Sequence, residues 1–533
     1  MKNSQCCVLY TNIDFSVQIC YTDFNKRKGF DLTMKKIIAT LLLICMLVPF
    51  VVACGEKSPA AVTTVADPAA TTEAPVTDAP VVTEYPDIPE GLDYDSYDFV
   101  ILSCLGNSIV FNDFSVENAD YDVVNDAIFK RNSEVESKFN IIIESVELSG
   151  DVFSSGVGTQ ALRKDYAAGE SQYDLCGVST WHAASAAPNG YLVDLYEVPY
   201  IDLSRSWWDS RANIDLGIYG KMFFSTGDIG ITDNLATHCI LFSKTIAAEN
   251  NITDIYDLVL NGKWTWDKFE EYVRMVSEDL NGDDVMSEYD RFGLLCWNDA
   301  FQASFGGARS KIAGVDPETS EFALTMYSDR NTTLATRITT LCFDSRYSIN
   351  TVASLYSAKV NAVGGMLGMF ANEQGLFATT IFRNVPQLRD AEMDFGIIPY
   401  PMFDDAQGEY GGYVSATYSN MYCVELHNQD LERTGAITEY IAYVSQKYVT
   451  PAYYEQTLKG REARDEESIK CLEIIFANRS FDAGVFYGVG GYTGSLTDMM
   501  KALNNNFERI YTAGKRMAEN TIKNINNKFS TQQ

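Results

Sequence analysis

Residues 173–182 read YDLCGVSTWH, a short apolar run that ends in a polar and aromatic turn. A run of this length with so few charges predicts a β-strand that is buried on both faces. Two further apolar runs precede it at 99–102 and 141–143, and each is followed by a stretch with helical spacing, at 122–139 and 159–168. Strand, helix, strand, helix, strand predicts a parallel or mixed sheet with helices on its faces, which is the α/β class.

The turn after this strand is the first candidate for a functional site. In open α/β sheets, ligands bind beyond the carboxyl ends of the strands. Trp181 and His182 follow the buried run directly, so we expect them at the mouth of a site. The alternative is a loop in which Trp181 closes one edge of the core.

The second half of the chain continues the alternation. Residues 265–278 and 436–446 have apolar positions at helical spacing, and residues 496–529 carry a long helical pattern in which Gly514 is expected to cause a break or bend. The chain beyond about residue 93 is long enough for two domains.

The N-terminal region carries the marks of secretion. Residues 34–36 read MKK, and an apolar run follows from 37 to 52, interrupted by proline. A basic start, a short apolar run and a small residue before the cut are typical of a signal peptide, which we assign to residues 34–53. The stretch Val51-Val52-Ala53-Cys54 resembles the lipobox of bacterial lipoproteins, which implies acylation of Cys54 and anchoring to the outer face of the cell membrane. A plain signal peptide is the alternative.

The segments on either side of this signal are interpreted by composition. Residues 1–33 precede the expected start at Met34, and we interpret them as a mis-annotated extension. Residues 54–93 are rich in Ala, Thr, Val, Pro, Asp and Glu. Such a segment buries too little apolar surface to offset its ordering entropy, so we expect a disordered linker.

Composition excludes some partners. The formal net charge is −31, from 41 basic and 72 acidic residues. Such a charge argues against nucleic acid and against docking on an anionic membrane surface, and favours a neutral or cationic ligand, although solubility alone would also explain it. Seven cysteines beyond Cys54 are scattered without a C-x-x-C motif, as expected of buried thiols.

Enzyme signatures are absent from the sequence. It contains no G-x-S-x-G, no H-E-x-x-H and no G-x-x-x-x-G-K-[ST] motif, so we expect a protein that is not an enzyme. Two of its many carboxylates could still face each other as the acids of a cell-surface glycoside hydrolase or lyase, which is the alternative function.

Four segments carry a family resemblance. Residues 241–244 read LFSK, 252–258 read ITDIYDL, 261–269 read NGKWTWDKF and 395–401 read FGIIPYP. In this order they resemble segments of family 1 of the bacterial extracellular solute-binding proteins, the maltose-binding-protein-like group that serves carbohydrate ABC transporters. The two tryptophans of 261–269 are expected to be core anchors.

The resemblance implies a two-lobed periplasmic-binding-protein-like fold, in which each lobe is a mixed sheet flanked by helices and a hinge joins the lobes. Lobe 1 would comprise 94–232 and 412–452, and lobe 2 would comprise 236–410 and 455–533. It also implies that a monomer captures a carbohydrate in the cleft between the lobes and delivers it to an ABC transporter permease, with no cofactor. A purely adhesive lipoprotein is a third possibility.

A sugar cleft should combine aromatic faces with amides and carboxylates, because sugars have apolar C–H faces and many hydroxyls. The candidates in expected loops are Trp181, His182, Trp207, Trp208, Asp233, Asn234, Trp297, Asn298, Phe370 and Tyr413. Structural packing is the alternative role for each tryptophan.

An acidic segment resembles a calcium loop. Oxygen-bearing side chains stand at its positions 1, 3, 5 and 12, which are Asp279, Asn281, Asp283 and Asp290. The glycine usual at position 6 is replaced by Asp284, and the last acid is Asp rather than Glu. A structural calcium ion is the hypothesis, and an acidic solvated turn is the alternative.

Overall fold

The computed structural model describes most of the chain beyond the expected linker. The described residues are 84–106, 111–116, 123–351, 362–455, 458, 463 and 465–531, and all of them fall in one compact unit that begins at Pro80. The expectations for residues 1–33, for the signal peptide at 34–53 and for Cys54 therefore lie outside the described residues. The α/β fold class is confirmed.

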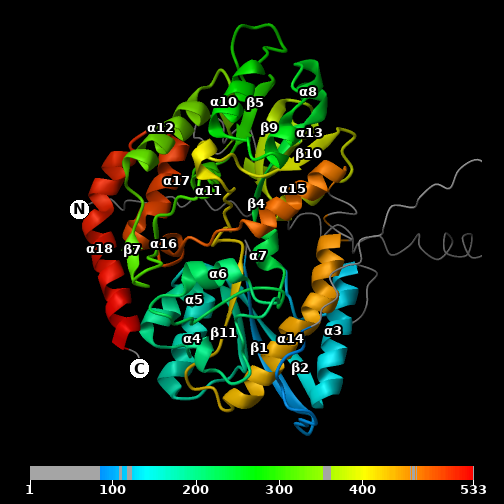
Figure 1. The fold of residues 1–533 in the computed structure, drawn as a ribbon, viewed down its shortest axis with the longest axis vertical. Coiled ribbons are helices and arrows are strands. Elements are labelled where there is room, and N and C mark those ends of the chain that lie inside the picture. The colour runs from blue at the N-terminus through cyan, green and yellow to red at the C-terminus, as the bar shows by residue number, and fades with distance from the viewer. Residues whose placement is uncertain are drawn as a thin grey trace, which may run out of the picture. The chain divides into compact units, whose positions relative to one another are not determined.

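The first sheet has the strand order β11-β3-β1-β2 (Figure 1). Its parallel strands are β1 (Tyr97–Gly106), β2 (Ile141–Gly150) and β3 (Leu175–Ser179), and β11 (Asn420–Cys423) runs antiparallel beside β3. Every residue of β3 is buried, as the apolar run predicts for a central strand covered on both faces.

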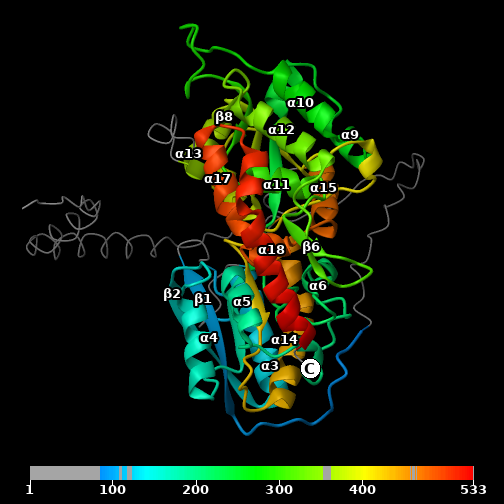
Figure 2. The ribbon, with the colours of Figure 1, turned by 90° about the vertical axis from the view of Figure 1, so that its left-hand side faces the viewer.

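Helices cover both faces of this sheet. α4 (Val157–Ala168) and α5 (Thr180–Ala186) lie on one face, while α3 (Val123–Phe139) and α14 (Leu431–Pro451) lie side by side on the other (Figures 1 and 2). Shorter helices complete this part of the chain, which we call lobe 1: η2 (Ala187–Asn189), η3 (Leu195–Glu197), α6 (Ser210–Leu216) and α7 (Thr232–Leu235).

The second sheet has the order β10-β4-β9-β5-β8. Its strands are β4 (His238–Ser243), β5 (Phe292–Cys296), β8 (Ser348–Asn350), β9 (Gly375–Ile381) and β10 (Phe395–Ile398). β5 is parallel to β8 and β9, whereas β4 is antiparallel to β9 and β10, so the sheet is mixed.

Helices and one hairpin surround the second sheet and form lobe 2 with it. The helices are α8 (Lys244–Glu249), α9 (Ile255–Leu260), α10 (Trp266–Met275), α11 (Ala300–Gly307), α12 (Asp329–Phe343), α13 (Ala362–Ala371), η4 (Phe382–Leu388), η5 (Asp405–Gln407) and α15 (Glu466–Ala477). The hairpin pairs β6 (Ala313–Val315) with β7 (Phe322–Leu324). Trp264 and Trp266 are buried in the core, as expected.

Three segments that connect the lobes lie side by side, and we call them the crossing segments. The first joins α7 to β4, the second precedes β11 and the third follows α15. The Val414 amide donates to the Ser480 carbonyl at 3.1 Å, and the Ser415 amide donates to the Ala236 carbonyl at 3.0 Å. These hydrogen bonds join the second crossing segment to the other two.

The C-terminal region differs from the expectation of one long helix. It contains α16 (Ala483–Phe486), η7 (Val489–Gly491), α17 (Tyr492–Ala502) and α18 (Phe507–Thr531). The break falls at Leu503, which takes a left-handed conformation with φ of 49°, and not at Gly514. Gly514 instead permits close packing, because a Cβ there would lie 2.5 Å from the Tyr492 ring.

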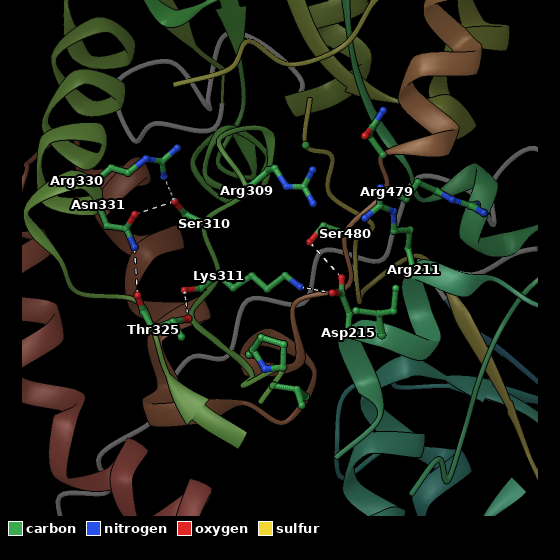
Figure 3. A pocket seen from close by; sticks show the side chains of 16 residues that line it. Arg211, Asp215, Arg309, Ser310, Lys311, Thr325, Arg330, Asn331, Arg479 and Ser480 are labelled. Atoms are coloured by element: carbon green, nitrogen blue, oxygen red, sulfur yellow. Dashed lines mark hydrogen bonds and ion pairs between the residues drawn. The ribbon is translucent and has the colours of Figure 1, made fainter. Parts of the chain in front are cut away.

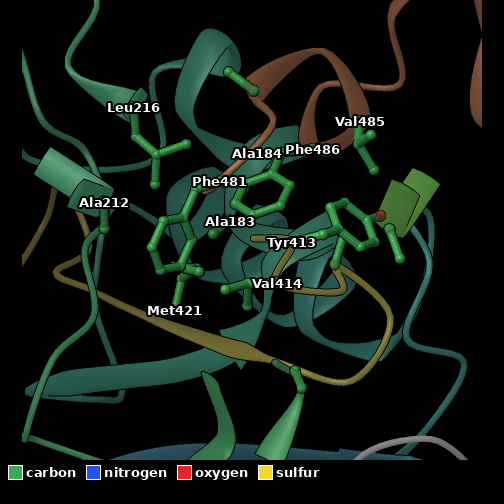
Figure 4. Packing of buried hydrophobic residues seen from close by; sticks show 14 of the residues in the cluster. Ala183, Ala184, Ala212, Leu216, Tyr413, Val414, Met421, Phe481, Val485 and Phe486 are labelled. Atoms are coloured by element: carbon green, nitrogen blue, oxygen red, sulfur yellow. The ribbon is translucent and has the colours of Figure 1, made fainter. Parts of the chain in front are cut away.

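The region 455–533, expected to belong to lobe 2, packs on both lobes. Phe481 and Phe486 insert among alanines of α5 and α6 in lobe 1 (Figure 4). The Phe529 ring of α18 lies 4.7 Å from the Phe223 ring, centroid to centroid, while the same helix also contacts α12 and β7. A helix of 25 residues is roughly 37 Å long, enough to follow elements of both lobes. None of the described helices is both long and apolar enough to cross a membrane.

The end of the expected linker is ordered. The Tyr85 ring packs on α14, 5.3 Å from the Tyr443 ring and 6.2 Å from the Tyr440 ring, and Ile88 is buried. Residues 84–93 are therefore part of the folded body, which corrects the prediction of a disordered linker over 54–93. Their aromatic and apolar side chains pack on a helix that lies about 350 residues later in the chain. A contact between segments so far apart in the sequence cannot be predicted from local residue patterns.

Two adjacent indoles bind one buried carboxyl group. Trp207 and Trp208 donate from Nε1 to Glu439 Oε1 and Oε2, at 2.9 and 2.8 Å. Glu439 lies on α14, and all three side chains are buried. Burial raises the pKa of Glu439 to about 7, and the two indole N–H groups oppose that rise. The pair therefore fixes the loop that precedes α6 on α14.

Arg479 holds the crossing segments through an ion network. Its Nη1 donates to Asp233 Oδ2 at 3.1 Å and to Asn234 Oδ1 at 2.5 Å, and its Nη2 donates to Asp209. Asp209 also caps α6 by accepting from the Ala212 amide at 2.9 Å. Burial raises the pKa of Asp233 to about 7, and the Arg479 charge opposes that rise. We call these four side chains, Asp209, Asp233, Asn234 and Arg479, the Arg479 network.

Removing the guanidinium should destabilise the fold strongly. We expect Arg479→Met to lower the free energy of unfolding by about 3–5 kcal/mol, because Asp209 and Asp233 would then be buried without a counter-charge. Urea denaturation followed by circular dichroism measures the change. Arg274→Met is the control: its ion pair with Asp344 spans 3.7 Å at the surface, so its loss should cost at most about 1 kcal/mol. Equal losses in the two variants would contradict the role assigned to Arg479.

Removing one indole N–H should weaken the contact with Glu439. We expect Trp208→Phe to lower the free energy of unfolding by about 1–3 kcal/mol, because one buried carboxyl oxygen loses its donor. Tyr196→Phe removes a polar atom from an exposed ring and should change stability by less than about 0.5 kcal/mol. A Trp208 variant as stable as the unsubstituted protein would show that Glu439 does not need this donor.

Candidate ligand-binding site

A cavity of about 530 Å³ lies between the lobes, and we call it the aromatic cleft. Its volume falls within the usual range for small-molecule sites. The residues that line it are Phe153, Trp181, Trp297, Asn298, Asp299, Gln302, Tyr413, Ser415, Thr417, Tyr418, Thr493, Gly494, Thr497, Asp498 and Lys501. They come from lobe 1, from lobe 2, from the second crossing segment and from α17.

The sheets position the two tryptophans. Trp181 lies in the first turn of α5, directly after β3, and the Ser179 hydroxyl accepts from the Trp181 amide at 3.3 Å to cap that helix. Trp297 directly follows β5. Each tryptophan therefore stands at the carboxyl end of a strand in its own lobe, where α/β sheets bind their ligands.

The aromatic rings give the cleft apolar walls. The Phe153 and Trp181 ring centroids are 6.1 Å apart, and the Trp297 and Tyr418 centroids are 6.3 Å apart. Tyr413 lies between the lobes on the second crossing segment and is buried. The Nε1 atoms of Trp181 and Trp297 are buried and find no acceptor among the described residues. A ligand that carries oxygen acceptors and apolar faces would satisfy both features.

Polar side chains stand among these rings. The half-buried Asp299 carboxyl lies 3.2 Å from Asn298 Nδ2. Desolvation raises the pKa of Asp299 to about 6, and the Lys501 ammonium opposes that rise. The Gln302 side-chain oxygen is buried and has no donor in the described part of the chain. The cleft thus offers both acceptors and donors to a hydroxyl-rich ligand.

Four of the ten residues predicted as ligand-binding line the cleft: Trp181, Trp297, Asn298 and Tyr413. Their contact with a ligand stays a prediction. Sequence reasoning missed Phe153, Tyr418 and the polar residues of α17. Tyr418 lies five positions after Tyr413 on the same crossing segment, so that segment's repeated tyrosines were a usable signal. Nothing local connects α17 with a loop that lies 190 residues earlier.

The structure places the other six outside the cleft. His182 is in the core, its Nε2 3.0 Å from the Asp151 carbonyl oxygen, and burial lowers its pKa. Phe370 is buried on α13, with its ring 6.2 Å from that of Phe395. The remaining four bind other protein groups, as described above: Trp207 and Trp208 bind Glu439, while Asp233 and Asn234 bind Arg479.

The acidic loop bonds to its own backbone. Asp279 accepts from the amides of Gly282 and Asp284, both at 2.7 Å. Asn281 accepts from the Asp283 amide, and Asp290 accepts from the amides of Leu280 and Ser287. Within the described residues, no three His, Cys, Asp or Glu side chains are grouped so that they could hold a metal ion. Calcium binding by this loop stays a prediction, and its geometry is that of a self-bonded turn.

Comparison with solved structures identifies proteins that share this fold. No protein-family model and no curated protein matches the sequence. Among solved structures, the galacto-N-biose-/lacto-N-biose I-binding protein of the ABC transporter from Bifidobacterium longum, in complex with lacto-N-biose, has a TM-score of 0.55 at 12% identity. That match covers 81% of this chain and 98% of the other.

Two further structures agree with it. UspC from M. tuberculosis has a TM-score of 0.52 at 10% identity and covers 79% of this chain and 99% of its own. A cyclo/maltodextrin-binding protein complexed with maltotetraose has a TM-score of 0.50 at 13% identity and covers 83% and 99%. The resemblance seen in the sequence is thus confirmed at the level of the fold: the chain has the two-lobed fold of the extracellular solute-binding proteins of ABC transporters.

Proposed function

We propose that the protein is the extracytoplasmic substrate-binding component of an ABC importer, and that it captures a carbohydrate in the aromatic cleft and delivers it to the permease. The observation that carries this proposal is the placement of Trp181 and Trp297 at the carboxyl ends of strands in different lobes, in one cleft, with buried indole N–H groups that have no acceptor among the described residues. Two proteins of the same fold were solved with lacto-N-biose and maltotetraose.

The binding mechanism follows from lobe placement. A sugar ring that stacks on Trp181 touches lobe 1, and its hydroxyls reach Asn298 and Asp299 in lobe 2. A ligand that contacts both lobes binds better when they are close together, so it shifts the population toward a closed arrangement. The permease would then recognise that arrangement, and the sugar would be released chemically unaltered.

The aromatic cleft suits a neutral sugar better than the second large cavity between the lobes. That cavity has about the same volume, 550 Å³, but its lining contains five arginine and lysine side chains and no aromatic ring. A sugar's apolar face gains most from packing on a ring, and its uncharged hydroxyls gain little from an excess of positive charge.

The cellular location is part of the proposal. Residues 34–53 would direct export, and acylated Cys54 would anchor the protein to the outer face of the cell membrane. The residues between Cys54 and Tyr85, whose ring packs on α14, would form the connection between anchor and body.

Truncating the cleft tryptophans should weaken sugar binding. We expect Trp181→Ala and Trp297→Ala each to raise the Kd for the best oligosaccharide at least about tenfold, a loss of ~1.4 kcal/mol, because the stacking surface is removed. Isothermal titration calorimetry measures the Kd after a thermal-shift screen has found the ligand. Tyr289→Ala removes an exposed aromatic ring from the acidic loop and should leave the Kd unchanged.

The chemical fate of the sugar separates the alternatives. Intact sugar recovered after incubation, together with a raised Tm, is the expected result. Shortened sugar would overturn the transport proposal in favour of a hydrolase or lyase. Absence of any Tm rise across mono- and oligosaccharides would overturn carbohydrate binding and favour the adhesive alternative.

Removing the acylation site should release the protein from the membrane. In a bacterial host that processes lipoproteins, we expect the unsubstituted protein in the membrane fraction and Cys54→Ser in the soluble fraction, because the acyl chains that supply about 0.8 kcal/mol per buried CH₂ are absent. Cys45→Ser, which alters a cysteine inside the expected signal, is the matched control and should stay membrane-bound. Membrane retention of Cys54→Ser would contradict lipid anchoring.

A further inference from the structure

The second interlobe cavity, of about 550 Å³, has a distinct chemistry, and we call it the cationic cavity (Figure 3). Its charged lining residues are Arg211, Asp215, Arg309, Lys311, Arg330 and Arg479. Arg211 and Asp215 lie on α6 of lobe 1, whereas Arg309 and Lys311 lie between α11 and β6 of lobe 2. No residue that lines it also lines the aromatic cleft.

The charge of this cavity is opposite to that of the chain. Five cationic side chains and one carboxylate line it, although the sequence as a whole has 41 basic and 72 acidic residues. A concave surface that carries one sign of charge focuses its field and raises the local concentration of counter-ions. Carboxylates pair with three of these cations, Arg309, Lys311 and Arg479, so among the described residues Arg211 and Arg330 are the lining cations without a carboxylate partner within 4.0 Å.

Three of the cations are already bound to protein groups. Lys311 pairs with Asp215, and Arg479 belongs to its own network. Arg330 donates to the Ser310 hydroxyl at 2.9 Å and to the Ala308 carbonyl at 2.8 Å, which are neutral acceptors. These contacts, together with the bond from Arg330 Nη2 to Gln407 Oε1 at 3.1 Å, hold the cavity wall in place.

The other two cations are available to a ligand. Arg309 pairs with Glu409 at the surface, where 39% of the arginine side chain and 65% of the glutamate side chain are exposed. A pair so open to solvent contributes little and is readily exchanged for another anion. Arg211 makes one long contact in the described structure, from Nε to the Ala477 carbonyl at 3.4 Å. Both guanidinium groups can bind carboxylate or phosphate in bidentate fashion.

We propose that the cationic cavity binds a small polyanion, a solute that carries two or more carboxylate or phosphate groups, between Arg211 of lobe 1 and Arg309 of lobe 2. Because the site draws on both lobes, the anion would stabilise one relative arrangement of them and would thereby be linked to ligand binding in the aromatic cleft. The site does not depend on what the aromatic cleft binds, so either proposal can fail alone.

Titration with citrate and with pyrophosphate tests this site. The full-length protein is titrated in buffers whose ionic strength is held constant with NaCl, and binding is followed by calorimetry and by the rise in Tm. We expect saturable binding of at least one of the two probes. Arg211→Gln with Arg309→Gln should weaken it at least about tenfold, because two bidentate donors are removed.

A matched control changes the same charge elsewhere. Arg274→Gln with Arg346→Gln removes two surface arginines that flank Asp344, outside the cavity, and should leave the affinity for the probe unchanged. If the cavity double variant is unfolded by circular dichroism, Arg309→Gln alone, which breaks one exposed ion pair, replaces it and is expected to show a smaller loss.

Three outcomes would overturn the site. The first is a Tm that follows ionic strength alone, without saturation by either probe. The second is equal weakening in the cavity and control variants, which would show a diffuse effect of net charge. The third is saturable binding that a folded cavity variant retains in full, which would place the anion elsewhere on the protein.

Discussion

Arg479 makes ion pairs with two buried carboxylates, one at the start of α6 in lobe 1 and one in α7, where the chain leaves that lobe. A buried charge network of this kind is stable only when it is complete, because each group alone would carry a large desolvation cost. The segment that bears Arg479 is also hydrogen-bonded to the second crossing segment. This one guanidinium therefore ties the third crossing segment to lobe 1 and at the same time lines one of the two interlobe cavities.

The two cavities divide the interlobe surface by chemistry. The aromatic cleft gathers five aromatic side chains with amides and hydroxyls, and the cationic cavity gathers arginine and lysine with no aromatic ring. Tyr413 and Gly411, only two residues apart on one crossing segment, line one cavity each. A small change in the path of that segment would alter both linings at once, which is the physical reason for the linkage proposed between them.

The features that could be predicted from the sequence are those that depend on local residue patterns. The buried strand at 175–179 was predictable because a strand covered on both faces must be apolar throughout, and Trp181 and Trp297 were predictable because each directly follows such a strand. Trp207 and Trp208 carry a similar local signal, but their role is decided by Glu439, more than 230 residues later. The contribution of α17 to the cleft and the position of the helix break at Leu503 depend on tertiary contacts. Such contacts cannot be predicted from the spacing of residues in the sequence.

The first sheet is completed by a distant part of the chain. The Cys176 strand β3 pairs with β11 at Cys423, 247 residues later, and all of the second sheet lies in the sequence between them. Contacts of such high sequence separation form slowly. As the polypeptide emerges during synthesis, β3 therefore keeps an unpaired edge until most of the chain has been made, and that edge is open to pairing with other chains. Because β11 is synthesised late, the first sheet is completed late in folding, and the nascent chain is prone to aggregation until then.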